Sequence, residues 1–389
     1  MAKSTVSRAQ AATMERSAGR VLTRTLAIHQ HPEVRLRIEA QEQEILSRFA
    51  AKSVDANGRR WPQEPDPLRT DYQRDRDRVI HSKAFRRLKH KTQVFIAPLG
   101  DHYRTRLTHT MEVTQVARTV ARALRLNEDL TEATALAHDL GHTPFGHAGE
   151  DAMAEILGGF RHNEQSVRVI EYLERDGRGL NLADQVKDGV LRHSKLRESV
   201  AAEGWGVANT LEGQIVKLAD SIAYLAHDID DALRAGVITN EQIPMEYRQA
   251  LGDTTSERIA TLVSDIVDYN WRIGTGEGET WRDAVGNGVA MALSPQTLQA
   301  MNGLREYMFA NVYTESTAKV EEPKTKYIIH GLFDYFFKHP DEMPEEFLTN
   351  PLDEPLERRV CDYVAGMTDR YAVQVFNRIY VPQAWAVVS

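Results

Sequence analysis

The sequence predicts an all-α protein, and three observations support this fold class. Several long segments place apolar residues at intervals of three and four, the spacing that gives a helix one apolar face. Runs with the strict alternation of a half-buried strand are few and short. The chain shows no internal repeat and no Gly/Ser-rich linker of the kind that separates independent modules. We therefore expect one interlocked helical body.

The first 70 residues are expected to form a tail, a helix and an arm. Residues 1–31 show no periodic apolar pattern and lack the apolar stretch of a secretory signal. They fit a flexible bacterial-type N-terminus, with an organelle transit peptide as the alternative. Residues 32–52 carry the spacing of a short amphipathic helix, and residues 53–71, rich in Gly, Pro and polar residues, predict a loop or arm.

Three helices are predicted next, over about residues 75–92, 104–126 and 130–141. Asn127 can cap the third of them, because its side chain can accept hydrogen bonds from backbone N–H groups of the first turn. His109 lies four residues before Val113, which places it on the buried side of the second helix. His138 and Asp139 lie at the C-terminal end of the third helix.

An irregular loop is predicted over residues 142–149, where Pro144 and two glycines interrupt the helical pattern. Another helix is expected to begin at Glu150, and His162 lies near the start of the helix after it. Loops held by rigid helices commonly carry catalytic groups, so this segment is a candidate for chemistry.

The clearest helix is predicted over residues 211–235. Its continuous apolar stripe consists of Ile215, Leu218, Ile222, Leu225, Ile229 and Leu233. Asp220, Tyr224 and Asp228 repeat every four residues on another face of the same helix. A purely structural helix has no need of two carboxylates and a phenol in one row.

The helical signals weaken after Gly236. Patterns resume over about residues 283–313 and 322–338, and the last helix is expected to break at Gly366 and then continue. We divide the chain into residues 1–70, a core over residues 71–236, and a C-terminal helical region over residues 237–389 that packs on the core.

The composition narrows the classes of protein to which this chain can belong. The chain has 389 residues, a formal charge of −8 and 42% apolar residues, and no segment approaches the ~20 continuous apolar residues of a membrane helix. We expect no membrane association. Cys361 is the only cysteine, which excludes an intramolecular disulfide and cysteine-rich zinc modules and fits a reducing, cytoplasmic location. Any metal must be held by nitrogen and oxygen ligands.

One segment is locally basic although the whole chain is acidic. Its basic residues are Arg74, Arg76, Arg78, Lys83, Arg86, Arg87, Lys89 and Lys91. The segment is either a solvated helix face paired with its own acids, Asp75 and Asp77 among them, or a binding site for polyphosphate or nucleic acid. The net negative charge argues against a general nucleic-acid coat.

Four side chains could converge on one divalent cation: His109, His138, Asp139 and Asp220. A lone buried histidine is commonly a satisfied core residue, and a single His-Asp pair is weak evidence. The four residues together are stronger evidence for a cation site, because they lie on three different predicted helices beside a loop with two more histidines. Two imidazoles and two carboxylates suit Mn, Fe, Zn, Ni or Co better than Ca, and Mg less ideally.

This pattern resembles the H…HD…D signature of the HD-domain superfamily of metal-dependent phosphohydrolases. The surrounding sequence is similar to the deoxyguanosinetriphosphate triphosphohydrolase (dGTPase) family, and most similar to its shorter, type 2 branch. The segments that carry the resemblance are RDRDRVIHSKAFRRLKHKTQVF, YRTRLTHTMEV, LAHDLGHTPFGHAGE, HNEQS, KLADSIAYLAHDIDDA and DYVAGMTDRYA. The likeness runs from about residue 32 to residue 380.

The resemblance implies an all-α HD enzyme that hydrolyses a deoxynucleoside triphosphate (dNTP), either dGTP or several dNTPs, at the α-phosphorus. The products would be the deoxynucleoside and tripolyphosphate. It implies one divalent metal per site, Mn or Mg before Fe, Zn, Ni or Co. The implied ligands are His109, His138, Asp139 and Asp220.

The resemblance also assigns roles around the metal. His147 matches the catalytic histidine and Glu150 its acidic partner, and His142 and His162 match histidines that line the phosphate site. The implied substrate contacts are Arg106, Tyr224, Gln93, Asp228 and, less specifically, Arg192. In-line attack on phosphorus needs an acid for the departing 5′-oxygen, and His147 is our prediction for it.

Two positions depart from the family pattern. A related animal dNTPase with a sterile-alpha-motif domain has a lysine where this chain has Ser221, so one phosphate contact must come from elsewhere. Thr143 replaces a proline of the loop, which we expect to be harmless.

Two other functions remain as alternatives. The first is a different HD enzyme, such as a nucleotidase or a phosphodiesterase, and the second is a regulatory sensor that binds nucleotide and single-stranded DNA through residues 74–91. The family resemblance further implies a homo-oligomer, from dimer to hexamer, with a second regulatory nucleotide in some members.

Overall fold

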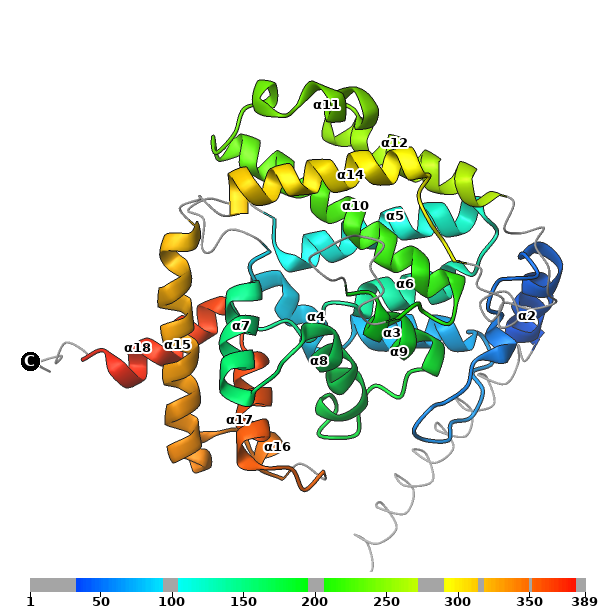
Figure 1. Ribbon diagram of the computed structural model, residues 1–389. Helices are drawn as coiled ribbons and strands as arrows, with labels where there is room; N and C mark the ends of the chain where they lie inside the picture. Colours follow the sequence, from blue (N-terminus) through cyan, green and yellow to red (C-terminus); the bar gives the residue numbers. More distant parts are fainter. Residues whose placement is uncertain are drawn as a thin grey trace, which may run out of the picture.

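The computed structural model describes residues 33–93, 104–194, 206–271, 290–313, 318–349 and 352–382. In these ranges the regular structure is helical, apart from an isolated antiparallel bridge between Thr92 and Thr105. The prediction of an all-α fold is confirmed (Figure 1). None of the helices in the described ranges is long and apolar enough to cross a membrane.

The centre of the fold is helix α10 (Leu211–Arg234), which packs against α5 (Arg106–Ala123), α6 (Glu128–Ala137) and α9 (Asp184–Arg192). The predicted stripe of α10 is buried as far as Ile229. Burial of such a continuous apolar face is the main stabilising contribution to a helical core. Figure 1 shows α10 running through the middle of the molecule, and α12 (Thr255–Asn270) also packs against it.

The other helices surround this centre. In chain order they are α2 (Glu33–Ile45), α3 (Asp71–Ile80), α4 (Lys83–Arg87), α7 (Gly146–Leu157), α8 (His162–Arg168), α11 (Met245–Leu251), α14 (Pro295–Met308), α15 (Ala318–Lys338), α16 (Glu345–Leu348), α17 (Leu356–Ala365) and α18 (Asp369–Tyr380). Short 3₁₀ and π turns extend or connect several of them.

Helix starts follow the capping residues of the sequence. The Asn127 side chain accepts hydrogen bonds from the backbone N–H groups of Asp129 and Leu130, both at 3.1 Å, as predicted. Thr105 caps α5 by accepting from the N–H of Thr108 at 3.4 Å. These caps fix where α5 and α6 begin, and so where His109 lies relative to the end of α6.

Several predicted boundaries were wrong. The helix expected over residues 75–92 is interrupted, because the Ser82 hydroxyl accepts from the N–H of Phe85 and starts α4 as a separate helix. The first helix ends at Ile45 rather than near residue 52, and Ile45 is exposed. Helix α7 begins at Gly146, earlier than expected. Helices α11 and α12 were missed, although α12 carries Ile259, Leu262 and Ile266 at helical spacing.

The C-terminal helices share a hydrophobic cluster with α7. Gly366 ends α17 as predicted, and α18 follows three residues later. The buried residues of this cluster include Phe145, Ala152, Met153, Ile329, Leu332, Phe336, Val360, Val364 and Val375. Figure 1 shows α7 beside α15 and α17. The segment that carries His147 is therefore packed against the C-terminal region.

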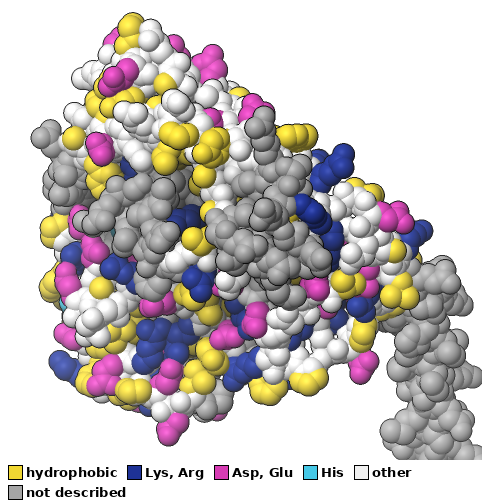
Figure 2. All heavy atoms as spheres, turned by 45° about the vertical axis from the view of Figure 1, so that its right-hand side comes forward, with side chains coloured by type: hydrophobic (Ala, Val, Ile, Leu, Met, Phe, Trp, Pro, Cys, Tyr) yellow, Lys and Arg dark blue, Asp and Glu magenta, His cyan; other side chains and the backbone are white. Residues whose placement is uncertain are grey.

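The basic segment over residues 74–91 is largely engaged with the protein itself. Arg76 pairs with Asp77 and Asp129, and Arg78 donates to the carbonyl of Asn181. Basic and acidic side chains are interspersed on the face shown in Figure 2. These contacts favour the first of the two interpretations, a helix face with its own acidic partners.

Candidate active site

A cluster of buried imidazole and carboxylate groups lies where α5, α6 and α10 meet. His109 on α5 places Nε2 3.1 Å from Oδ1 of Asp220 on α10. His138, at the end of α6, places Nε2 3.9 Å from the same oxygen and 3.5 Å from Oδ2 of Asp139. The structure therefore brings together all four residues that the sequence singled out for a cation.

His138 offers a free lone pair to this cluster. Its Nδ1 lies 2.6 Å from the carbonyl oxygen of Ala135, so Nδ1 must carry the hydrogen of this bond. Its Nε2 is buried and has no hydrogen-bond partner among the residues that the structure describes. A buried polar atom without a partner costs free energy unless a ligand satisfies it. The ligand atoms of His109, His138 and Asp220 all lie within 4.8 Å of one another, which suits a single ion.

Asp139 joins the cation cluster to a second set of histidines. Its Oδ2 lies 2.5 Å from Nη1 of Arg106, and its Oδ1 lies 3.4 Å from Nε2 of His142 and 3.9 Å from Nε2 of His193. Burial alone would raise the pKa of Asp139, but its neighbours His138 and Arg106 hold the pKa well below its usual value. This carboxylate is therefore ionised.

The surroundings of His109, His142 and His193 favour their neutral forms. Burial lowers the pKa of His109, and burial together with Arg106 lowers the pKa of His142 well below its usual value. Burial and the neighbouring His138 lower the pKa of His193 to about 3. Neutral imidazoles and ionised carboxylates are the protonation states that bind a cation.

A second group of side chains lies next to this cluster. Glu150 is buried, and its Oε2 lies 3.1 Å from Nδ1 of His147 and 3.1 Å from Nδ1 of His162. Oε1 of Glu150 also accepts a hydrogen bond from the backbone N–H of His162 at 2.9 Å. Burial raises the pKa of Glu150, but His162 and His147 lower it by more, so this carboxylate is ionised.

His147 differs from the other histidines of the site in its exposure. Its side chain is 64% exposed, whereas that of Glu150 is 6% exposed. His147 lies in the first turn of α7, not in the preceding loop as predicted, because the helix starts at Gly146. A histidine oriented by a buried carboxylate and open to solvent can exchange a proton with a molecule bound at the site.

His193 belongs to the site but was missed in the sequence. Its Nδ1 lies 2.6 Å from the carbonyl oxygen of Val190, and its Nε2 lies 3.3 Å from Nε2 of His162. The signal that could have found it is helical spacing, because Val186 and Val190 are buried on α9 and His193 continues the same face. With His138 and Asp139 it forms another group of ligand atoms within 4.8 Å.

The remaining predicted residues lie around the cluster in different ways. Tyr224 and Asp228 follow Asp220 at one and two turns of α10, and Asp228 is buried. Gln93 is near the start of α7, since its carbonyl oxygen would lie 3.6 Å from a Cβ placed on Gly146. The guanidinium of Arg106 donates hydrogen bonds to the carboxylate of Asp139 and to the carbonyl of Thr92.

Arg192 and Ser221 each have a hydrogen-bond partner within the protein. Nε of Arg192 donates to Asp188 at 2.6 Å, and it is the neighbouring His193 that enters the cluster. The Ser221 hydroxyl donates to the carbonyl of Lys217 at 2.8 Å within α10.

Comparison with known proteins matches two family descriptions. Residues 106–225 match the HD domain, and residues 291–378 match the phosphohydrolase-associated domain. The first range contains His109, His138, Asp139 and Asp220, so the matched domain holds the whole candidate cation site.

Curated relatives are similar over nearly the entire chain. A deoxyguanosinetriphosphate triphosphohydrolase-like protein of Caldanaerobacter subterraneus subsp. tengcongensis is 51% identical over 354 residues, which cover 91% of this chain and 97% of the relative. Proteins described in the same words are 45% identical in Desulfatibacillum aliphaticivorans, covering 90% and 98%, and 39% identical in Geobacter sulfurreducens, covering 88% and 96%. The chain therefore belongs to the deoxyguanosinetriphosphate triphosphohydrolase-like family of HD-domain, metal-dependent phosphohydrolases.

Proposed function

We propose that this protein hydrolyses dNTPs, dGTP or several of them, at the α-phosphorus, releasing the deoxynucleoside and tripolyphosphate. The observation that carries the proposal is the unpartnered Nε2 of His138, buried between Asp139 and Asp220 and adjoining the exposed His147 and its partner Glu150. A cation site beside an oriented proton donor is what in-line hydrolysis of a phosphate ester requires. The description of the relatives supports a nucleoside triphosphate as the substrate.

We assign His109, His138, Asp139 and Asp220 as ligands of one divalent metal, Mn or Mg before Fe, Zn, Ni or Co. The ion would polarise a phosphoryl oxygen and make a bound water molecule more acidic. His193 is a further nitrogen donor, with Nε2 3.9 Å from Oδ1 of Asp139. Its Nδ1 donates to the carbonyl of Val190, so its Nε2 can accept a hydrogen bond from Nε2 of His162 and help to orient that ring.

His147 is our candidate for the acid that protonates the departing 5′-oxygen. Glu150 engages Nδ1 of His147, which leaves Nε2 on the exposed side of the ring for the substrate. His142 and His162 stack with ring centroids 4.1 Å apart and lie between His147 and Asp139. We propose that these two rings line the phosphate site.

The other predicted contacts are proposed to bind the rest of the substrate. Tyr224 and Asp228 continue the face of α10 that carries Asp220, so they can meet the sugar and the phosphates next to the metal. Gln93 lies beside the start of α7, where it can reach the sugar or base. Arg106 orients Asp139 and can share its charge with a phosphate.

The test is a panel of the four dNTPs with purified protein and Mn(II), in which the phosphate products are separated and quantified. Stoichiometric tripolyphosphate is expected. Orthophosphate or pyrophosphate would instead identify another HD-type nucleotidase or phosphodiesterase, which would share the metal site. The His138→Ala variant is the control for a contaminating phosphatase.

Partners and assembly follow from the same proposal. We expect a cytoplasmic homo-oligomer, from dimer to hexamer, whose activity can depend on a second, regulatory nucleotide. Light scattering with and without dNTP measures the assembly directly.

A single-stranded-DNA sensor is the weaker alternative function, because many basic groups of residues 74–91 already have partners within the protein. Salt-dependent DNA binding lost with those residues would favour it.

A further inference from the structure

Asp369 connects the C-terminal region to the segment that carries the catalytic histidines. It is the first residue of α18, within the DYVAGMTDRYA segment. Its Oδ1 accepts a hydrogen bond from the backbone N–H of Phe145 at 3.0 Å, and its Oδ2 accepts one from the backbone N–H of Thr92 at 2.8 Å. One carboxylate therefore joins two segments that are distant in the sequence, both of which border the site.

Phe145 is a position where the backbone needs such support. Its φ is 63°, in the left-handed region that bulky residues rarely adopt. It is the N-cap of α7 and makes no side-chain cap of its own, and His147 follows two residues later. A strained conformation persists only where the surroundings hold it. The bond from Phe145 to Asp369, together with the buried Phe145 ring, supplies that support.

Thr92 carries the second half of the connection. Its carbonyl oxygen accepts a hydrogen bond from Nη2 of Arg106, whose Nη1 contacts Asp139. The next residue along the chain is Gln93, a proposed substrate contact. By holding Thr92, Asp369 supports the arginine that orients a proposed metal ligand.

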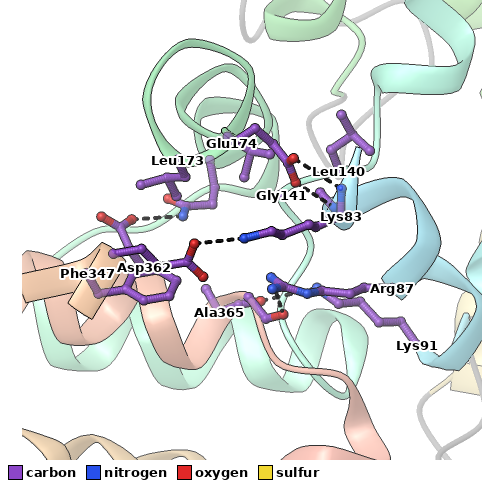
Figure 3. Close-up of a pocket in the computed structure, with 15 residues that line it drawn as sticks. Lys83, Arg87, Lys91, Leu140, Gly141, Leu173, Glu174, Phe347, Asp362 and Ala365 are labelled. Atoms are coloured by element: carbon purple, nitrogen blue, oxygen red, sulfur yellow. Dashed lines mark hydrogen bonds and ion pairs between the residues drawn. The ribbon is translucent and has the colours of Figure 1, made fainter. Parts of the chain in front are cut away.

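Lys91 holds the other end of the segment between His142 and His147, at the carbonyl of His142. Its ammonium group is buried and donates to the carbonyl oxygens of His142 and Ala365, the latter at 3.1 Å. Arg87 donates to the next carbonyl, that of Gly366, at 3.1 Å. Figure 3 shows Arg87 and Lys91 reaching side by side towards Ala365 at the end of α17. Cations at the C-terminal end of a helix are favourably placed.

We propose that Asp369 is a positioning residue for the catalytic segment. With Lys91 at the opposite end, it fixes the backbone between His142 and His147 against α17 and α18, so that both imidazoles face the cation cluster. Asp369 itself contacts only backbone N–H groups in these bonds, so it acts through the loop and not on the substrate. The effect on turnover rests on the proposed function, whereas the effect on the loop does not.

The test compares Asp369→Asn with the wild-type protein. The amide has one acceptor oxygen and presents N–H donors to the second backbone N–H, so at least one of the two bonds is lost without a change of size. Hydrogen–deuterium exchange of a peptide over residues 142–149 should be about tenfold faster or more. Bound Mn(II) should be unchanged, and kcat for dNTP hydrolysis should fall about tenfold while KM changes less.

Thr368→Ala is the matched control at the start of the same helix. It removes the cap that accepts from the N–H of Tyr371 and therefore weakens α18, but it leaves both bonds of Asp369 in place. This variant should lower the melting temperature and leave kcat unchanged. Lys91→Met, which cuts the other end of the loop, should reproduce the pattern of Asp369→Asn.

The outcomes separate the two proposals. Unchanged exchange of residues 142–149 in Asp369→Asn, or faster exchange with unchanged kcat, would overturn the positioning role. Equal losses of kcat in Asp369→Asn and Thr368→Ala would show that Asp369 only stabilises α18 and does not position the catalytic segment. If the wild-type protein releases no tripolyphosphate, the proposed function fails, and the exchange data still decide whether Asp369 holds the loop.

Discussion

Nε2 of His138 lies 3.9 Å from Oδ1 of Asp220 on another helix, and no residue in the described ranges is its hydrogen-bond partner. His109 approaches the same Asp220 oxygen from α5. A close approach of two buried imidazole nitrogens and a partly buried carboxylate oxygen is an arrangement that could hold a cation.

The first prediction concerns this cation. His138→Ala should lower the affinity for Mn(II) by about 100-fold or more, because it removes a donor from a buried site. Metal content after dialysis, measured by mass spectrometry, checks it. His330→Ala is the control, since His330 is paired with Glu155 on the surface and should keep the ion. Equal metal content in both variants would contradict the assignment.

The second prediction separates proton transfer from metal binding. Glu150→Gln should retain Mn(II) but lower kcat by about 100-fold or more, because the carboxylate that orients His147 is lost. Glu155→Gln, on the exposed part of α7 and paired with Lys326, is the matched control and should keep full activity. A fully active Glu150→Gln would show that the His147–Glu150 pair is not the acid.

The third prediction concerns the pH dependence of stability. Glu212 is fully buried, and burial raises its pKa to about 7, although hydrogen bonds from the backbone N–H groups of Asn127 and Ala51 partly oppose this. The folded pKa exceeds the unfolded value, so the contribution of Glu212 to stability falls as pH rises from about 4.5 to about 7 and is constant above that.

Glu212→Gln removes this titration and keeps an acceptor oxygen. The free energy of unfolding of the variant, relative to wild type, should therefore be higher at pH 8 than at pH 5, by up to about 3 kcal/mol. Urea denaturation at the two pH values measures it. A difference between variant and wild type that does not change with pH would contradict the buried titration.

Local patterns could be predicted from the sequence, and contacts between distant segments could not. The spacing of apolar residues identified α10, and the residue type at Asn127 identified the start of α6, because both depend on neighbours along the chain. Arg106 pairs with Asp139, and His193 approaches the same carboxylate, only because the helices that carry them pack together. Nothing in the local sequence around Phe145 indicates that Asp369 holds it.

The start of α7 also depends on a contact with a distant segment, and it could not be predicted from the local sequence. Pro144 and two glycines predicted a loop that continues to Glu150. In the structure the left-handed Phe145 turns the chain so that the helix begins at Gly146, and this conformation depends on the C-terminal region. His147 was therefore predicted to lie in a loop, whereas the structure places it in the first turn of α7.

The central claim is that water attacks the α-phosphorus of a dNTP at the His109, His138, Asp139 and Asp220 cluster. Hydrolysis in water enriched in heavy oxygen, followed by mass spectrometry of both products, tests it most directly. One heavy oxygen is expected in tripolyphosphate and none in the deoxynucleoside, because the bond between phosphorus and the 5′-oxygen breaks. Heavy oxygen in the deoxynucleoside, or in orthophosphate or pyrophosphate released in place of tripolyphosphate, would contradict it.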